Sequence, residues 1–86
     1  STKIKRVTVS EGVEKICFAA FRYSDLEYIS LPSTLKEIHE YAFAECKKLK
    51  KMIVPKSLNK YALRDLKFAL RKVPGCHVKY VDEKEE

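Results

Sequence analysis

Apolar and polar residues follow a pattern that returns every 22 or 23 positions along the chain. Residues 26–31 read LEYISL, residues 49–54 read LKKMIV, and residues 4–9 read IKRVTV. A weaker fourth copy, GCHVKY, begins 26 positions after the third, at residue 75. A unit that recurs at such a period predicts that equivalent residues stack directly over one another.

Each copy of the pattern predicts a short β-strand. Apolar residues alternate with polar ones and are rich in β-branched types, which favours strands of five or six residues with one buried face. Because successive strands are a whole repeat apart and run in the same direction, they can pair only in parallel. Val7, Ile29 and Met52 are the equivalent inward residues, and we expect them to be direct neighbours.

A second extended piece and an aromatic turn are predicted after each of the first two strands. The segments GVEKI and TLKEI have the character of short strands and end at Ile16 and Ile38. The segments AAF and YAF that follow predict one helical or 3₁₀ turn. This turn would lay Phe21 and Phe43 across the core, stacked repeat over repeat.

The third repeat departs from the first two. Residues 58–73 read LNKYALRDLKFALRKV, in which apolar residues mostly follow helical spacing. We expect a helix from about residue 59 or 60 to Lys72, ending at Pro74 and Gly75, and a last strand in HVKYV. An amphipathic helix here would cover the open end of a repeat core. Its outward face is basic and consists of Arg64, Lys67, Arg71 and Lys72.

Residues 4–58 resemble leucine-rich repeats. The segment ISLPSTLKEIHEYAFAECKKLKKMIVP, at residues 29–55, is similar to the BspA-like class of these repeats. The first repeat is looser, with Ser10 and Ser24 where that form has Pro and Cys. The residues that carry the resemblance are Leu31, Pro32, Leu35, Ile38, Ala42, Phe43, Cys46 and Leu49.

The resemblance implies an α/β fold. Its expected form is a short right-handed leucine-rich-repeat solenoid with a parallel strand ladder, helical turns on the other side, and a C-terminal capping helix and strand. It also implies a module without catalytic residues or cofactor that binds a protein or a surface ligand, at a cell surface or after secretion. The three cysteines leave at least one unpaired, so an intracellular location stays open.

The repeats predict one domain followed by a charged tail. A chain of 86 residues is one domain at most, and about three stacked units are the minimum for a stable array. We expect the domain to span 1–81 and an acidic tail to span 82–86. Within the domain the expected units are 4–25, 26–48, 49–74 and a terminal strand at 75–81.

The chain is strongly basic outside its tail. Its net charge is +6, and without the one Lys and four acidic residues of 82–86 it carries 17 basic and 8 acidic side chains, or +9. A basic nucleic-acid or polyanion-binding module is therefore the alternative function, with the basic helix face as its contact. The helical segment has no known nucleic-acid motif, and its aromatic residues do not alternate with its basic ones. No apolar run reaches membrane length, so no membrane insertion is expected.

The outward side of the predicted strand ladder is the candidate binding site. Between the buried positions each strand presents two side chains to solvent, and neighbours in a row should lie about 4.8 Å apart. An aromatic residue flanked by cations suits protein hot spots and anionic ligands, although a merely solvated sheet face is the alternative interpretation. One row is Arg6, Tyr28, Lys51 and His77, and the other is Thr8, Ser30, Ile53 and Lys79.

One pair of residues raises an enzyme or metal-site hypothesis. Cys17 and His39 occupy equivalent places in adjacent repeats, so their side chains are expected to approach within about 5 Å as a nucleophile and base or as two metal ligands. The third equivalent position is Ala62, which supplies no further member. The preferred expectation is therefore no catalytic and no metal site.

The start of the first repeat raises a self-association hypothesis. Stacked repeats bury their apolar stripe against a neighbour, and the first repeat has a neighbour on one side only within this sequence. We expect the open end around Ile4 to mediate dimerisation or to continue an upstream array.

Overall fold

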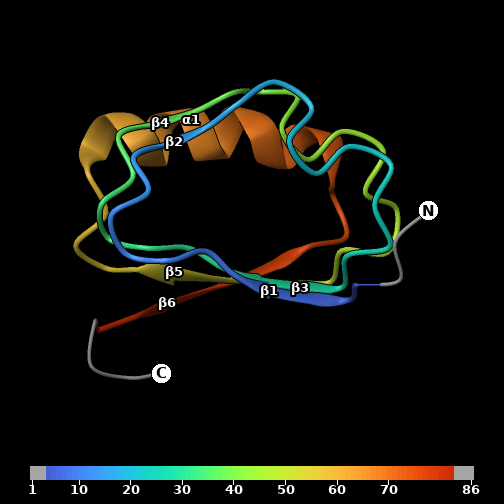
Figure 1. The fold of residues 1–86 in the computed structure, drawn as a ribbon, viewed down its shortest axis with the longest axis horizontal. Coiled ribbons are helices and arrows are strands. Elements are labelled where there is room, and N and C mark those ends of the chain that lie inside the picture. The colour runs from blue at the N-terminus through green and yellow to red at the C-terminus, as the bar shows by residue number, and fades with distance from the viewer. Residues whose placement is uncertain (1–3, 83–86) are drawn as a thin grey trace.

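The computed structural model describes residues 4–82, in which two parallel ladders and one helix enclose a core (Figure 1). Residues 83–86 of the predicted acidic tail lie outside the described residues. The longer ladder contains β1 (Arg6–Thr8), β3 (Tyr28–Ser30), β5 (Lys51–Pro55) and β6 (His77–Val81). The shorter ladder and the helical segment contain β2 (Lys15–Ile16), β4 (Glu37–Ile38), α1 (Lys60–Ala69) and the 3₁₀ turn η1 (Leu70–Lys72).

The longer ladder has the register that the repeat period predicts. Its strand order is β1-β3-β5-β6, and every pairing is parallel. Val7 pairs with Ile29, Ile29 with Met52, and Met52 with Val78. The prediction that these residues are direct neighbours is confirmed.

The first strands are shorter than predicted. β1 and β3 have three residues each, and only β5 and β6 reach five. Single hydrogen bonds continue the contact beyond them, since the Val9 N–H donates to the Ser30 oxygen and the Leu31 N–H to the Ile53 oxygen, each at 2.9 Å. After β3 the chain leaves the ladder at Pro32, which has no N–H to donate. After β1 it leaves at a turn that contains Gly12 at φ 103°.

The segments after β2 and β4 form separate turns and not a continuous helix. The Arg22 N–H donates to the Ala19 oxygen and the Ala44 N–H to the Tyr41 oxygen, each at 3.2 Å, so each segment contains the predicted turn with the i→i+3 hydrogen bond of a 3₁₀ turn. Residues at positive φ interrupt the backbone there: Ala19 at 58°, Tyr23 at 64° and Glu45 at 62°. Residues in the left-handed conformation end a helical segment because the backbone groups that follow them are no longer aligned with the helix axis. The predicted stack is nevertheless present, with the rings of Phe21 and Phe43 parallel within 3° and 5.6 Å apart.

Helix α1 lies on the side of the core opposite the longer ladder, beside β4 (Figure 1). It begins after Asn59, whose side-chain oxygen accepts hydrogen bonds from the backbone N–H groups of Tyr61, at 2.7 Å, and Ala62, at 3.4 Å. With η1 it ends at Lys72, as the sequence predicts. Its core-facing side consists of Ala62, Leu66 and Ala69.

The core forms one cluster that runs from Ile16 of the first repeat into α1. Phe43, Leu35 and Leu66 are fully buried within it. In residues 4–82, no helix has the length and apolar character needed to cross a bilayer.

Candidate ligand-binding face

The structure brings all eight predicted binding residues onto one side of the longer ladder. Arg6, Tyr28, Lys51 and His77 are register partners in that order, as are Thr8, Ser30, Ile53 and Lys79. Residues between them, such as Ile29 and Met52, have no exposed surface, so the eight side chains point away from the core. We call these eight residues the ladder face.

The ladder face is cationic around a less polar centre. Tyr28, Ser30 and Ile53 are half-buried, whereas the outer strands carry exposed side chains. The guanidinium carbon of Arg6 lies 4.1 Å from the centroid of the Tyr28 ring, which is a cation–π contact. The face carries Lys51, Lys79 and His77 beside Arg6, and none of its eight residues is acidic. Such a surface can offer a ring and cations together to an anionic group.

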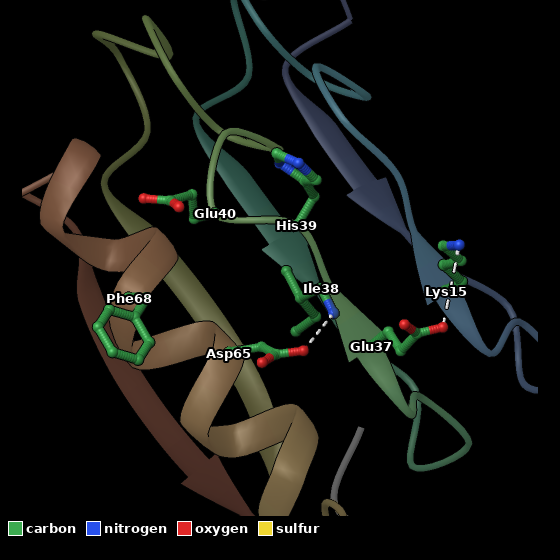
Figure 2. A pocket seen from close by; sticks show the side chains of 7 residues that line it. All are labelled: Lys15, Glu37, Ile38, His39, Glu40, Asp65 and Phe68. Atoms are coloured by element: carbon green, nitrogen blue, oxygen red, sulfur yellow. Dashed lines mark hydrogen bonds and ion pairs between the residues drawn. The ribbon is translucent and has the colours of Figure 1, made fainter.

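A hollow of about 430 Å³ lies between β4 and α1, and Figure 2 shows the seven residues that line it. The Asp65 carboxylate bridges the two elements by accepting a hydrogen bond from the Ile38 N–H at 3.1 Å. Lys15 pairs with Glu37 at 3.9 Å across the short ladder. The lining carries three carboxylates, Glu37, Glu40 and Asp65, and one lysine, Lys15, so the hollow is net acidic.

Cys17 and His39 do not form the hypothesised pair. The His39 ring packs edge-on against Phe18 with centroids 5.2 Å apart, and its Nδ1 accepts the Tyr41 N–H at 3.0 Å. No hydrogen bond links Cys17 to His39 in the described part of the chain, where Cys17 is exposed. Among residues 4–82, no group of three or more His, Cys, Asp or Glu side chains could hold a metal ion.

The other two cysteines are structural. Burial raises the pKa of the Cys46 thiol, and contact with the Ser24 hydroxyl lowers it only in part. The Cys46 thiol also donates to the Phe21 oxygen at 2.8 Å, which ties two repeats together. Burial likewise raises the pKa of Cys76. A raised pKa leaves less thiolate at neutral pH, so neither thiol is activated as a nucleophile.

The basic helix face carries aromatic partners that the sequence interpretation missed. Arg64 lies over Tyr61 at 5.4 Å, Arg71 over Phe68 at 5.1 Å, and Lys72 over a ring of the second repeat, that of Tyr41, at 4.7 Å. The first two pairs are three residues apart, which places them on one side of a helix. That spacing was visible in the sequence, whereas the Tyr41 contact depends on the fold. The expectation that aromatic and basic residues do not alternate here is wrong, because the structure pairs them in cation–π contacts.

Comparison with known proteins gives one match. A family model described as the BspA type leucine rich repeat region (six copies) matches residues 1–71. No curated protein and no solved structure matches the chain. The matched range contains every described element except β6 and the last residue of η1.

Proposed function

Because the chain belongs to the BspA-type leucine-rich repeat family, we propose that it is a non-catalytic binding module whose ladder face recognises a protein or a surface ligand. The family supports repeat-based binding in general and is typically non-catalytic. The observation that supports this particular site is the ladder face itself, where the register aligns eight side chains with three permanent cations and no acid.

We further propose that the array is a right-handed solenoid with α1 and β6 as its C-terminal cap. The parallel register of equivalent residues supports stacking of the repeats. α1 covers the core with Ala62, Leu66 and Ala69, and Asp65 satisfies the Ile38 N–H that a further repeat would otherwise bind. A terminal unit with a polar outer side is what an array of repeats requires.

The chemistry of the ladder face favours a partner with an acidic group beside an apolar one. Tyr28 and Ile53 offer half-buried apolar surface at the centre, where contacts are best shielded from water. Arg6 and Lys51 flank Tyr28 in the same row and supply charge-assisted contacts to a carboxylate or a sulfate.

The test compares two triple variants that remove the same residue types. Arg6→Ala, Tyr28→Ala and Lys51→Ala alter the ladder face, whereas Arg64→Ala, Tyr61→Ala and Lys67→Ala alter the helix. We expect the immobilised chain to retain a partner from a cell extract, and the ladder variant, but not the helix variant, to lose it. Circular dichroism confirms that both fold. Equal retention by the two variants would move the site away from the ladder face.

Binding of a polyanion through α1 is the second candidate function. The observation that favours it is the placement of Arg64, Arg71 and Lys72 over exposed aromatic rings, since cations beside stacking surfaces suit single-stranded nucleic acid. Titration of a random single-stranded oligonucleotide at several salt concentrations tests it. The helix variant should weaken binding and reduce the salt slope by about 0.7 for each phosphate that the helix no longer neutralises. Absence of binding to the unaltered chain at low salt rejects this candidate.

A further inference from the structure

The cations of the ladder face have no acidic partner within residues 4–82. Elsewhere in the repeats charged side chains form ion pairs, as Lys36 does with Glu14 at 3.6 Å. Arg6, Lys51 and Lys79 form none with another described residue. Their side chains stand roughly perpendicular to the sheet, whereas a further strand would join it at its edge, so strands added to the ladder would leave them accessible. These charges are available to acidic groups of a partner.

Apolar surface lies between these charges. Tyr28 and Ile53, on the neighbouring strands β3 and β5, are half-buried. Arg6 and Lys51 lie on either side of Tyr28 in the same row, and the Arg6 guanidinium carbon is held 4.1 Å from the centroid of the Tyr28 ring. A complementary partner therefore places an apolar group at the centre of this row and an acidic group on each side of it.

The spacing of the strands selects the conformation of such a partner. Adjacent strands lie about 4.8 Å apart, so Tyr28, Lys51 and His77 follow Arg6 at about 4.8, 9.6 and 14.4 Å along the row. On one side of an α-helix, residues i+3, i+7 and i+10 follow residue i at about 4.5, 10.5 and 15 Å along the axis. The two series agree within about 1 Å.

An extended peptide does not fit the same row. Residues on one side of a strand follow one another at about 6.8 Å. If one of them faced Arg6, the next would lie about 2 Å past Tyr28 and about 3 Å short of Lys51. The row therefore favours a helical partner over an extended one.

We propose, on the basis of the function proposed above for the ladder face, that its partner is an amphipathic α-helix that lies across the strands. The helix carries acidic residues seven positions apart, opposite Arg6 and Lys51, and an apolar residue between them, opposite Tyr28. A helix is about 10 to 12 Å wide and the two rows are about 6.8 Å apart, so one helix covers both rows, and a second apolar residue contacts Ile53.

Two synthetic peptides of one composition test the proposal. Both are helices of roughly twenty residues built from alanine and glutamine, a length at which alanine-rich helices form in water, with two glutamates and two leucines. In the first peptide the glutamates are seven positions apart and the leucines are three and four positions after the first glutamate, which places all four on one side. In the second peptide the glutamates are five positions apart and point to different sides.

Fluorescence anisotropy at low salt measures the two dissociation constants, and circular dichroism verifies that the peptides are equally helical. We expect the first peptide to bind roughly 10-fold more tightly, as expected for one additional charge-assisted contact. Equal affinities would show only a general attraction between opposite charges and would overturn the proposal. A chain that binds neither peptide overturns it as well.

A pair of lysine variants locates the contact on the protein. Lys51→Ala should raise the dissociation constant of the first peptide roughly 10-fold, whereas Lys67→Ala, which removes an equally exposed class of side chain from α1, should leave it unchanged. Circular dichroism verifies that both variants fold. Equal effects of the two variants would also overturn the proposal.

The peptides separate this inference from the proposed function. If the ladder variant loses a partner from the cell extract but the two peptides bind equally, the ladder face is a binding site whose partner is not such a helix. If the ladder variant and the helix variant retain that partner equally, the ladder face itself is not the site.

Discussion

At the scale of single residues, Asp65 supplies the hydrogen-bond acceptor that the short ladder loses where α1 takes the place of a further strand. The Ile38 N–H points away from β2, since its neighbour His39 donates toward β2, to the Ile16 oxygen at 2.9 Å. A further strand would accept the Ile38 N–H, but α1 has taken its place, and the Asp65 carboxylate accepts it instead (Figure 2). A single side chain thus ends the short ladder without leaving a part-buried donor unpaired.

Asp65→Ala is expected to lower the free energy of unfolding by about 1 to 2 kcal/mol, because it leaves the Ile38 N–H without its acceptor. Asp65→Asn keeps an amide oxygen and should lose less. Guanidinium chloride unfolding measures both. The control is Arg64→Ala, which removes an ion pair to Asp65 at 3.9 Å and an exposed cation–π contact with Tyr61 at 5.4 Å, and should cost about 1 kcal/mol or less. The account of Asp65 is wrong if its alanine variant costs no more than this control.

At the scale of elements, the strands, the helix and the place of the turns were predictable, and the backbone conformation of the turns was not. Strand register follows from a period that can be read along the sequence, and the helix follows from apolar spacing and from Pro74. The turns depend on contacts between repeats: the Phe21 N–H donates to the Ala42 oxygen at 2.9 Å, and the Tyr23 N–H donates to the Ala44 oxygen at 3.3 Å. The second of these bonds holds Tyr23, a non-glycine residue, at positive φ, which no local propensity favours.

The candidate site, too, could be predicted only in part from the sequence. The rows of the ladder face follow from the period alone, because a parallel register fixes which side chains are neighbours. The cation–π contacts of Arg6 with Tyr28 and of Lys72 with Tyr41 depend on side-chain conformations and on the path of the turns. These conformations are set by packing and could not be derived from spacing.

Helix α1 owes its starting point to Asn59. The Asn59 oxygen accepts from two of the N–H groups that have no partner inside the helix. Asn59→Ala should therefore lower the free energy of unfolding by about 1 kcal/mol, as measured by urea unfolding. Asn59→Asp keeps the acceptor and should be nearly neutral. An alanine variant that loses no stability would show that α1 is positioned by packing alone.

At the scale of the whole molecule, one core joins the repeats, so stability is shared rather than local. The buried cluster contains residues of both ladders and of α1. Phe43, in the second repeat, is a fully buried member of this cluster. Its ring stacks on Phe21 of the first repeat, which is half-buried. Loss of the Phe43 ring therefore affects the packing of more than one repeat.

Phe43→Ala is expected to cost about 3 to 5 kcal/mol, since it removes a buried ring and leaves a cavity that the surrounding turns cannot fill. A domain of this length has a total stability near the low end of the ordinary range of about 5 to 15 kcal/mol, so the variant should keep at most about 2 kcal/mol and be partly unfolded at 25 °C. Circular dichroism during urea titration measures this. Phe21→Ala is the matched control, and it should cost less because its ring already contacts solvent at the open end. If the two alanine variants were equally stable, the first repeat would have to be covered in solution as completely as the second, because only a covered Phe21 ring has as much buried surface to lose.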